Sequence, residues 1–164
     1  MKINIITNIE AFKALKEDWD ILFSKSNCTV FQSFDFNYYS WKHELISDNR
    51  NQLAIAVITI NESIVAIFPF YIDSNKQLRF INDVHFDFCD FLTKETINFS
   101  VVYSYLKQEI DFKSMRLINV KQGANIYKVI SELNTKNKVI LSISEYSFLN
   151  VEKGSFPYNV PHYR

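Results

Sequence analysis

Two continuous apolar, β-branched runs, joined by only two polar residues, constrain the fold of this chain more than any other feature. The runs are Gln52–Ile60 and Ser63–Ile72, and Asn61-Glu62 connects them. Continuous runs of this composition are typical of strands that are buried on both faces. A third run, Gln77–Asn82, alternates as a half-buried strand does. Because short connections join the three runs, we expect an antiparallel meander.

The chain must make its tight turns almost without glycine. Only 2 of its 164 residues are glycine, against about eleven at average usage. We therefore expect turns in left-handed backbone conformations, which glycine adopts at a lower energy cost, at Asn61-Glu62 and Asp73-Ser74-Asn75. Pro69 lies inside the second run and cannot donate to a ladder, which predicts a bulge or a locally unpaired side there.

Helical periodicity marks the segments before and after the meander. The first predicted helix runs from a capping box at Thr7-Asn8-Ile9-Glu10 to about Ser24. The second is capped by Ser33 and carries Phe34, Tyr38, Trp41 and Leu45 on its apolar face. Two more are predicted, one from Thr96 to Ile110 and one over Ala124–Leu133. Further strands are predicted at Lys2–Ile6, Met115–Val120, Val139–Ser144 and Tyr146–Val151. Trp19 and Trp41 fall on the apolar stripes of the first two helices, so both should be buried.

This element order predicts a single α/β domain over residues 1–153, with residues 154–164 as a tail or linker. We expect a mostly antiparallel, twisted central sheet flanked by about four helices, with a β-clam or ferredoxin-like arrangement as the alternative.

Charge and cysteine content exclude several function classes. Lysine and arginine together number 18, as do aspartate and glutamate, so a nucleic-acid or anionic membrane partner is not expected. No apolar run is long enough for a membrane span. Cys28 and Cys89 make neither a disulfide framework nor a zinc site, and Met1–Asn8 lacks the apolar run of a signal peptide. We therefore expect a cytoplasmic protein.

Four motifs in the chain resemble one family of bacterial enzymes. They are Phe31-Gln32-Ser33-Phe34-Asp35-Phe36 continuing to Trp41, Ile64–Phe70, Leu78–Asn82 and Asp87–Leu92. Together with the element order, they resemble the N-terminal half of a tandem GNAT-like acyltransferase, of the FemAB type or of the acetyltransferase-like proteins of polysaccharide loci. The resemblance covers about residues 1 to 155. It implies a GNAT-like domain, with the acyl-donor site in a second domain.

The segment Asn82–Leu92 departs from the usual GNAT pattern. In that fold, a glycine-rich turn at this place holds the pyrophosphate of coenzyme A with backbone N–H groups. Here the segment has no glycine and carries three aspartates among aromatic residues. We therefore expect this chain to bind no cofactor, with acetyl-CoA or another acyl donor bound by the second domain.

Candidate site residues follow from the entry motif and the acidic segment. The predicted substrate-binding residues are Phe31, Gln32, Ser33, Trp41, Asp87 and Asp90. No catalytic residue is assigned. His85, Asp87 and Asp90 have the donor types of a divalent-metal site, but an aromatic loop with solvent-facing polar residues is favoured and no metal is assigned. Glu44 could deprotonate an amine and equally suits an exposed helical face.

The predicted function is that of a non-catalytic, substrate-side half of an acyltransferase acting on a sugar, an amino sugar or a cell-envelope precursor. Its expected partners are a second GNAT-like domain or a second copy of the chain, and a small-molecule or glycan-precursor acceptor. Two alternatives remain open. One is a non-enzymatic binding or dimerisation module. The other is a self-contained acetyltransferase, for which Lys121-Gln122-Gly123 is the one place with a glycine before a helix.

Overall fold

A long hairpin organises the domain. The computed structural model describes residues 1–83 and 87–130. The first arm of the hairpin comprises β2 (Gln52–Leu53) and β3 (Ile55–Ile60), and the second comprises β4 (Ser63–Phe68) and β5 (Phe70–Ile72). The pairings of β2 with β5 and of β3 with β4 are antiparallel and keep one register up to a shift between Ile58 and Thr59.

Around this hairpin the strands form two four-stranded sheets. The remaining strands are β1 (Lys2–Ile6), β6 (Gln77–Phe80), β7 (Leu92–Thr93) and β8 (Ser114–Met115). The strand orders are β1-β3-β4-β7 and β2-β5-β6-β8. Only β6 and β8 pair in parallel among the described strands, and α4 lies between them in sequence. The predicted α/β class and the mostly antiparallel pairing are confirmed, whereas the strands form two sheets in place of the single central sheet that was predicted.

The turns rest on non-glycine residues, as the composition predicts. Asn61 and Glu62, between β3 and β4, have φ values of 47° and 63°. Between β5 and β6, the Asp73 carboxylate accepts hydrogen bonds from the amides of Asn75 and Gln77, both at 2.9 Å, and Lys76 has a φ of 61°. Side-chain hydrogen bonds thus support a backbone conformation that would otherwise favour glycine.

Pro69 marks the point where the second hairpin arm changes its outer neighbour. β4 pairs with β7, whereas β5 pairs with β6, and the strand is interrupted at Pro69 between them. The amide of Ile81 donates to the Pro69 carbonyl at 2.9 Å, after which the chain leaves this edge and returns to it at Leu92. Residues 82–83 and 87–91, as far as the structure describes this segment, therefore belong to an excursion between two strands that pair with the same arm.

The helices follow the predicted segments with shifted ends. They are α1 (Ile9–Ala14), α2 (Lys16–Lys25), α3 (Phe34–His43), α4 (Phe99–Glu109) and α5 (Asn125–Ile130), with short 3-10 turns η1 (Val30–Gln32) and η2 (Leu45–Ser47). The first predicted helix is two helices divided at Leu15, and its cap is Asn8, whose side chain accepts from the Ala11 amide at 2.8 Å. The capping box assigned to Thr7 was therefore wrong.

Other predicted boundaries change for similar reasons. Asn98 caps α4, so that helix begins at Phe99 and not at Thr96. The strand predicted over Met115–Val120 is reduced to β8. The strands predicted at residues 139–144 and 146–151, and the tail boundary at residue 154, lie outside the described residues.

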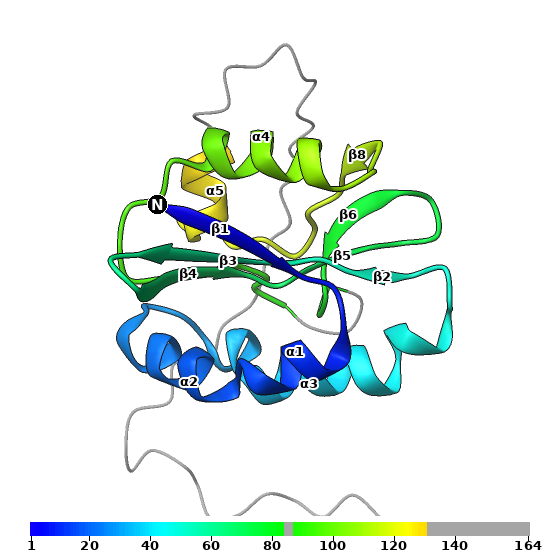
Figure 1. Ribbon diagram of the computed structural model, residues 1–164, viewed down its shortest axis with the longest axis horizontal. Helices are drawn as coiled ribbons and strands as arrows, with labels where there is room; N and C mark the ends of the chain where they lie inside the picture. Colours follow the sequence, from blue (N-terminus) through cyan, green and yellow to red (C-terminus); the bar gives the residue numbers. More distant parts are fainter. Residues whose placement is uncertain (84–86, 131–164) are drawn as a thin grey trace, which may run out of the picture. The chain divides into compact units, whose positions relative to one another are not determined.

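Helices cover both faces of the sheets (Figure 1). On one face, the α1–α3 core combines Phe12, Trp19, Leu22, Phe34 and Trp41 with Ile55, Val57, Ile67 and Tyr71 of the strands. On the other face, the α4–α5 core combines Phe99, Val102, Leu106, Ile126 and Val129 with Ala56, Ile58, Phe68, Phe70 and Phe80. Successive strand residues alternate between the two cores because side chains alternate across a strand. The burial predicted for Trp19 and Trp41 is confirmed, since both are 5% exposed or less.

Candidate functional site

A crevice of about 200 Å³ takes part of its lining from the segments that follow the parallel strands β6 and β8 in the chain. Its lining residues come from three segments and include Asn27, Cys28, Thr29, Gln32, Phe88, Asp90, Lys121 and Gly123. In open α/β sheets, ligands bind most often outside the carboxyl ends of parallel strands. The crevice brings together the entry motif, the acidic excursion and the turn before α5, all of which the sequence singled out.

Gln32 fixes one wall of the crevice. Its side-chain amide donates to the Phe88 carbonyl at 2.5 Å, and its side-chain oxygen accepts from the Thr29 amide at 2.9 Å. The indole of Trp19 donates to the backbone carbonyl of Gln32 at 2.9 Å. These bonds join the connection before α3 to the excursion after β6, so Gln32 acts as a buried clamp between segments that are far apart in the sequence.

The other residues of the entry motif divide between scaffold and surface. Ser33 caps α3 by accepting from the Phe36 amide at 3.5 Å. Trp41 is buried in the α1–α3 core, and its ring lies 6.3 Å from that of Tyr71. Phe31 is half-buried, and its carbonyl accepts a hydrogen bond from the Asn82 side chain at 2.5 Å.

Asp90 is a buried helix cap. Its carboxylate accepts hydrogen bonds from the backbone amides of Asn125 at 2.7 Å, Ile126 at 2.8 Å and Phe91 at 2.9 Å. Asn125 and Ile126 begin α5, whose first amides have no partner within the helix. Burial raises the pKa of Asp90, and the three amide hydrogen bonds oppose that rise. The carboxylate thus ties the excursion to α5 across 35 residues.

Asp87 is exposed and follows directly after residues that the structure does not describe. His85, the third member of the metal site weighed above, is one of those residues. Within residues 1–83 and 87–130, no group of three histidine, cysteine, aspartate or glutamate side chains could hold a metal ion. Four of the six predicted binding residues are thus engaged inside the protein, and contact of Phe31 and Asp87 with a substrate stays a prediction.

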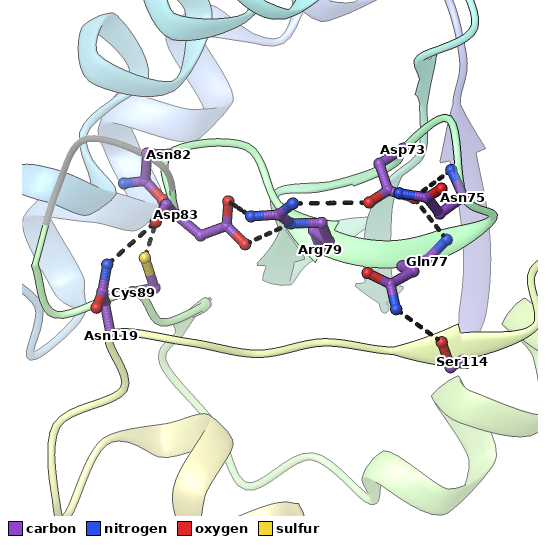
Figure 2. A network of polar contacts seen from close by, with 9 residues as sticks. All are labelled: Asp73, Asn75, Gln77, Arg79, Asn82, Asp83, Cys89, Ser114 and Asn119. Carbon is purple, nitrogen blue, oxygen red and sulfur yellow. Dashed lines mark hydrogen bonds and ion pairs between the residues drawn. The ribbon is translucent and has the colours of Figure 1, made fainter. Parts of the chain in front are cut away.

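A buried ionic network beneath the excursion was not predicted from the sequence (Figure 2). Arg79 of β6 donates two hydrogen bonds of 2.9 Å to the carboxylate of Asp83, which is fully buried. A second carboxylate, that of Asp73, lies 3.6 Å from the same guanidinium. Asn119 extends the network by donating to the Asp83 carbonyl at 3.0 Å. An arginine in a short strand, four residues before an aspartate, was the available signal.

Cys28 is the cysteine that lines the crevice. Burial raises the pKa of Cys28 to about 11, and the nearby Asp90 carboxylate adds to the effect. A thiol with such a pKa is protonated at neutral pH and is therefore a poor nucleophile. The Lys121 ammonium lies 5.5 Å from the centre of the Phe88 ring. The crevice thus brings together an aromatic ring, a cation and a protonated thiol.

Comparison with known proteins finds no matching family model, curated protein or solved structure. None of the helices described here is long and apolar enough to cross a membrane.

Proposed function

We propose that this chain is the non-catalytic, substrate-side half of a GNAT-like acyltransferase of the FemAB type, acting on a sugar, an amino sugar or a cell-envelope precursor in the cytoplasm. The strand arrangement supports the proposal. β1, the two hairpin arms and β6 are antiparallel in sequence order, and β8 then joins β6 in parallel after the helix α4. This is the strand order and sense expected of the GNAT architecture that the motifs resemble.

The backbone amides after β6 are the observation that carries the proposal. A coenzyme A site at this place would need free N–H groups directed at a pyrophosphate. Here the amide of Asp83 donates to the Phe80 carbonyl at 3.2 Å, that of Cys89 to the Asn119 carbonyl at 2.7 Å, and that of Phe91 to the Asp90 carboxylate at 2.9 Å. A phosphate would also meet the Asp90 carboxylate. The engagement of these three amides, among the residues that the structure describes in this segment, favours donor binding by a second domain or a second copy.

The crevice is then one wall of the acceptor groove. Phe31 contacts the crevice residue Phe88, with ring centroids 6.2 Å apart, and the exposed Asp87 precedes Phe88 in the chain. The Gln32 clamp joins the excursion to this wall. A carboxylate at a groove mouth suits an acceptor that presents hydroxyl or ammonium donors.

Calorimetric titration of the chain with acetyl-CoA tests the proposal. We expect no saturable heat up to millimolar ligand. Saturable binding in the micromolar range, weakened by Lys121→Ala and unchanged by Lys13→Ala on the distant surface of α1, would instead identify a self-contained acetyltransferase.

The alternative of a binding or dimerisation module is favoured by one observation. Tyr39, on the solvent-facing side of α3, is 51% exposed and lines a shallow hollow. Sedimentation over a range of protein concentrations tests self-association. A dimer that Tyr39→Ala abolishes would support the module, and a monomer at all concentrations would leave the hollow available to a ligand.

A further inference from the structure

β1 has the longest strand edge without a neighbour in the described part of the chain. Each outermost strand of the two sheets pairs on one side only, and β1 has five residues whereas β2, β7 and β8 have two each. Natural edge strands are usually short, or carry charges, prolines or bulges that block pairing with another chain. β1 has no proline, and its one charged residue, Lys2, stands at its start. Its middle is therefore open to pairing.

The hydrogen bonds of the hairpin determine which backbone groups of β1 face the sheet. The Ala54 amide donates to the Phe70 carbonyl at 3.0 Å, so the backbone groups of Ala54 point toward the second hairpin arm. Backbone groups alternate in direction along a strand, so those of Ile55 point toward β1. Ile6 is the β1 residue paired with Ile55. The backbone groups of Ile6 are therefore bonded to β3.

The same alternation leaves two residues of β1 facing outward. Asn4 lies two residues before Ile6 and shares its orientation, whereas Ile3 and Ile5 direct their N–H and C=O groups away from β3. Within residues 1–83 and 87–130, no backbone hydrogen bond beyond the β1–β3 pairing involves Ile3 or Ile5. The edge thus presents a donor and an acceptor at every second residue.

A groove of about 410 Å³ lies beside this edge, and we call it the edge groove. Ile5 and Thr7 line it from β1 and the residue after that strand, and Tyr105 and Glu109 line it from α4. Figure 1 shows α4 running above β1. Ile5 therefore belongs both to the outward-facing edge and to the groove.

The edge groove is acidic. Glu109 and Asp111 line it, and its described lining includes no lysine, arginine or histidine. Glu109 is exposed and has no ion-pair partner among the described residues. The Asp111 carboxylate lies 3.4 Å from the Lys76 ammonium, but the Asp111 side chain is 88% exposed, so this pair is weak. The C-terminal end of α4 adds partial negative charge. The groove therefore favours a cationic group.

Edge and groove together fit an extended peptide. The donors and acceptors that recur at every second residue match those of another extended chain, which can pair with the edge as an added strand. A residue paired with Ile5 has its side chain on the same face of the sheet as the Ile5 side chain, which packs against the α4–α5 core. A basic side chain at that position lies on the side of Glu109.

A second copy of β1 fits the edge groove less well. If β1 paired with itself, Ile3 and Ile5 of the copy would lie on the face toward α4, and Lys2 would lie on the opposite face because side chains alternate along a strand. The acidic groove would then receive apolar side chains. Charge therefore favours a different chain with a basic residue.

We propose that the outer edge of β1 binds an extended peptide as an added strand, with a lysine or arginine of the peptide in the edge groove. The edge groove shares no lining residue with the crevice, so this inference goes beyond the proposed acyltransferase role and does not depend on it.

Calorimetric titration of the full chain with designed peptides tests the proposal. The probe is an acetylated and amidated peptide of eight residues, with threonine at alternate positions and valine at the others, except for one central lysine. A matched peptide has glutamate in place of lysine. We expect saturable binding of the lysine peptide and at least about tenfold weaker binding of the glutamate peptide. Glu109→Lys should reverse this preference, and Glu17→Lys on α2 makes the same charge change on the other face of the sheets and should leave it unchanged.

Methylation of single peptide amides tests strand pairing without altering the protein. The lysine amide points toward β1 and the amide of the next threonine points away from it. N-methylation at the lysine should therefore weaken binding at least about tenfold, and N-methylation at the threonine should have a much smaller effect.

Hydrogen exchange measured by NMR locates the bound peptide. In the free chain, the amides of Asn4 and Ile6 should exchange slowly and those of Ile3 and Ile5 quickly, because only the first two are bonded to β3. Saturation with the lysine peptide should slow exchange at Ile3 and Ile5 by at least about tenfold.

Four results would overturn the proposal. They are the absence of saturable binding by the lysine peptide, equal affinity for the lysine and glutamate peptides, equal effects of the two N-methylations, and slow exchange of the Ile3 and Ile5 amides in the free chain. Protection of these amides that grows with protein concentration would also overturn it, by assigning the edge to a second copy. None of these measurements uses an acyl donor, so their outcome is independent of the acetyl-CoA titration.

Discussion

Replacement of Asp90 by alanine should destabilise the domain by about 2–3 kcal/mol. The side chain accepts three amide hydrogen bonds, two of them from the first residues of α5. A buried amide left without an acceptor costs about 1–3 kcal/mol. Removal of a carboxylate whose burial is itself unfavourable offsets part of this loss. Asp90→Asn keeps one acceptor oxygen, so it should cost only about half as much.

Urea denaturation followed by far-ultraviolet circular dichroism measures the free energy of unfolding. Hydrogen exchange at residues 125–130 locates the effect, because α5 should lose protection first when its cap is removed. Asp87→Ala, three residues earlier on an exposed side chain, is the control and should change stability by less than about 0.5 kcal/mol. A loss below about 1 kcal/mol in Asp90→Ala would show that the cap contributes little and that α5 is held by packing alone.

The pH dependence has a definite sign. Burial raises the pKa of Asp90 in the folded protein, so the folded state binds the proton more readily than the unfolded state, whose pKa is about 3.9. The pH-dependent part of the Asp90 contribution to stability is then fully present below that pH and is lost as pH rises through the folded pKa, whereas the contribution of the amide hydrogen bonds to the ionised carboxylate remains. Asp90→Asn cannot titrate, so its stability relative to the native chain should improve between pH 4 and the folded pKa. A constant difference across that range would refute the argument.

Three further outcomes are expected. Trp19→Ala and Trp41→Ala should each lower the free energy of unfolding, measured by urea denaturation, by roughly 3–5 kcal/mol, because removal of a large buried ring leaves a cavity. Losses below about 1 kcal/mol at both positions would contradict the core assignment. Arg79→Ala should lower the free energy of unfolding by about 3–5 kcal/mol because it leaves the buried Asp83 carboxylate without its partner. The double variant Arg79→Met with Asp83→Leu should recover part of that loss, and no recovery would mean that packing dominates. Burial raises the pKa of Cys28 to about 11. At pH 7.5 its thiol should therefore react with iodoacetamide at least about a hundredfold more slowly than the same thiol in the urea-unfolded chain. Equal rates would show that the thiol is not buried.

The sequence predicts the elements of the fold better than the contacts between them. β1, the hairpin arms and α3 follow from periodicity and capping, which are local signals. The division of the first helix at Leu15 has no such signal.

The contacts that shape the candidate site join residues that are far apart in the sequence. Gln32 reaches Phe88 across 56 residues, and Asp90 reaches Asn125 across 35. Both were predicted to bind substrate because a polar residue on a loop looks the same whether it faces a ligand or a distant backbone amide. The direction of the side chain is decided only when the two segments pack together.

The two cores on opposite faces of the sheets have a spectroscopic consequence. Both tryptophans of the chain belong to the α1–α3 core, and the α4–α5 core holds phenylalanine and aliphatic residues in the same role. Intrinsic tryptophan emission therefore reports the packing of one face alone. A partial unfolding that releases α4 and α5 would leave the emission maximum nearly unchanged, so a tryptophan placed at Phe99 would be needed to observe it.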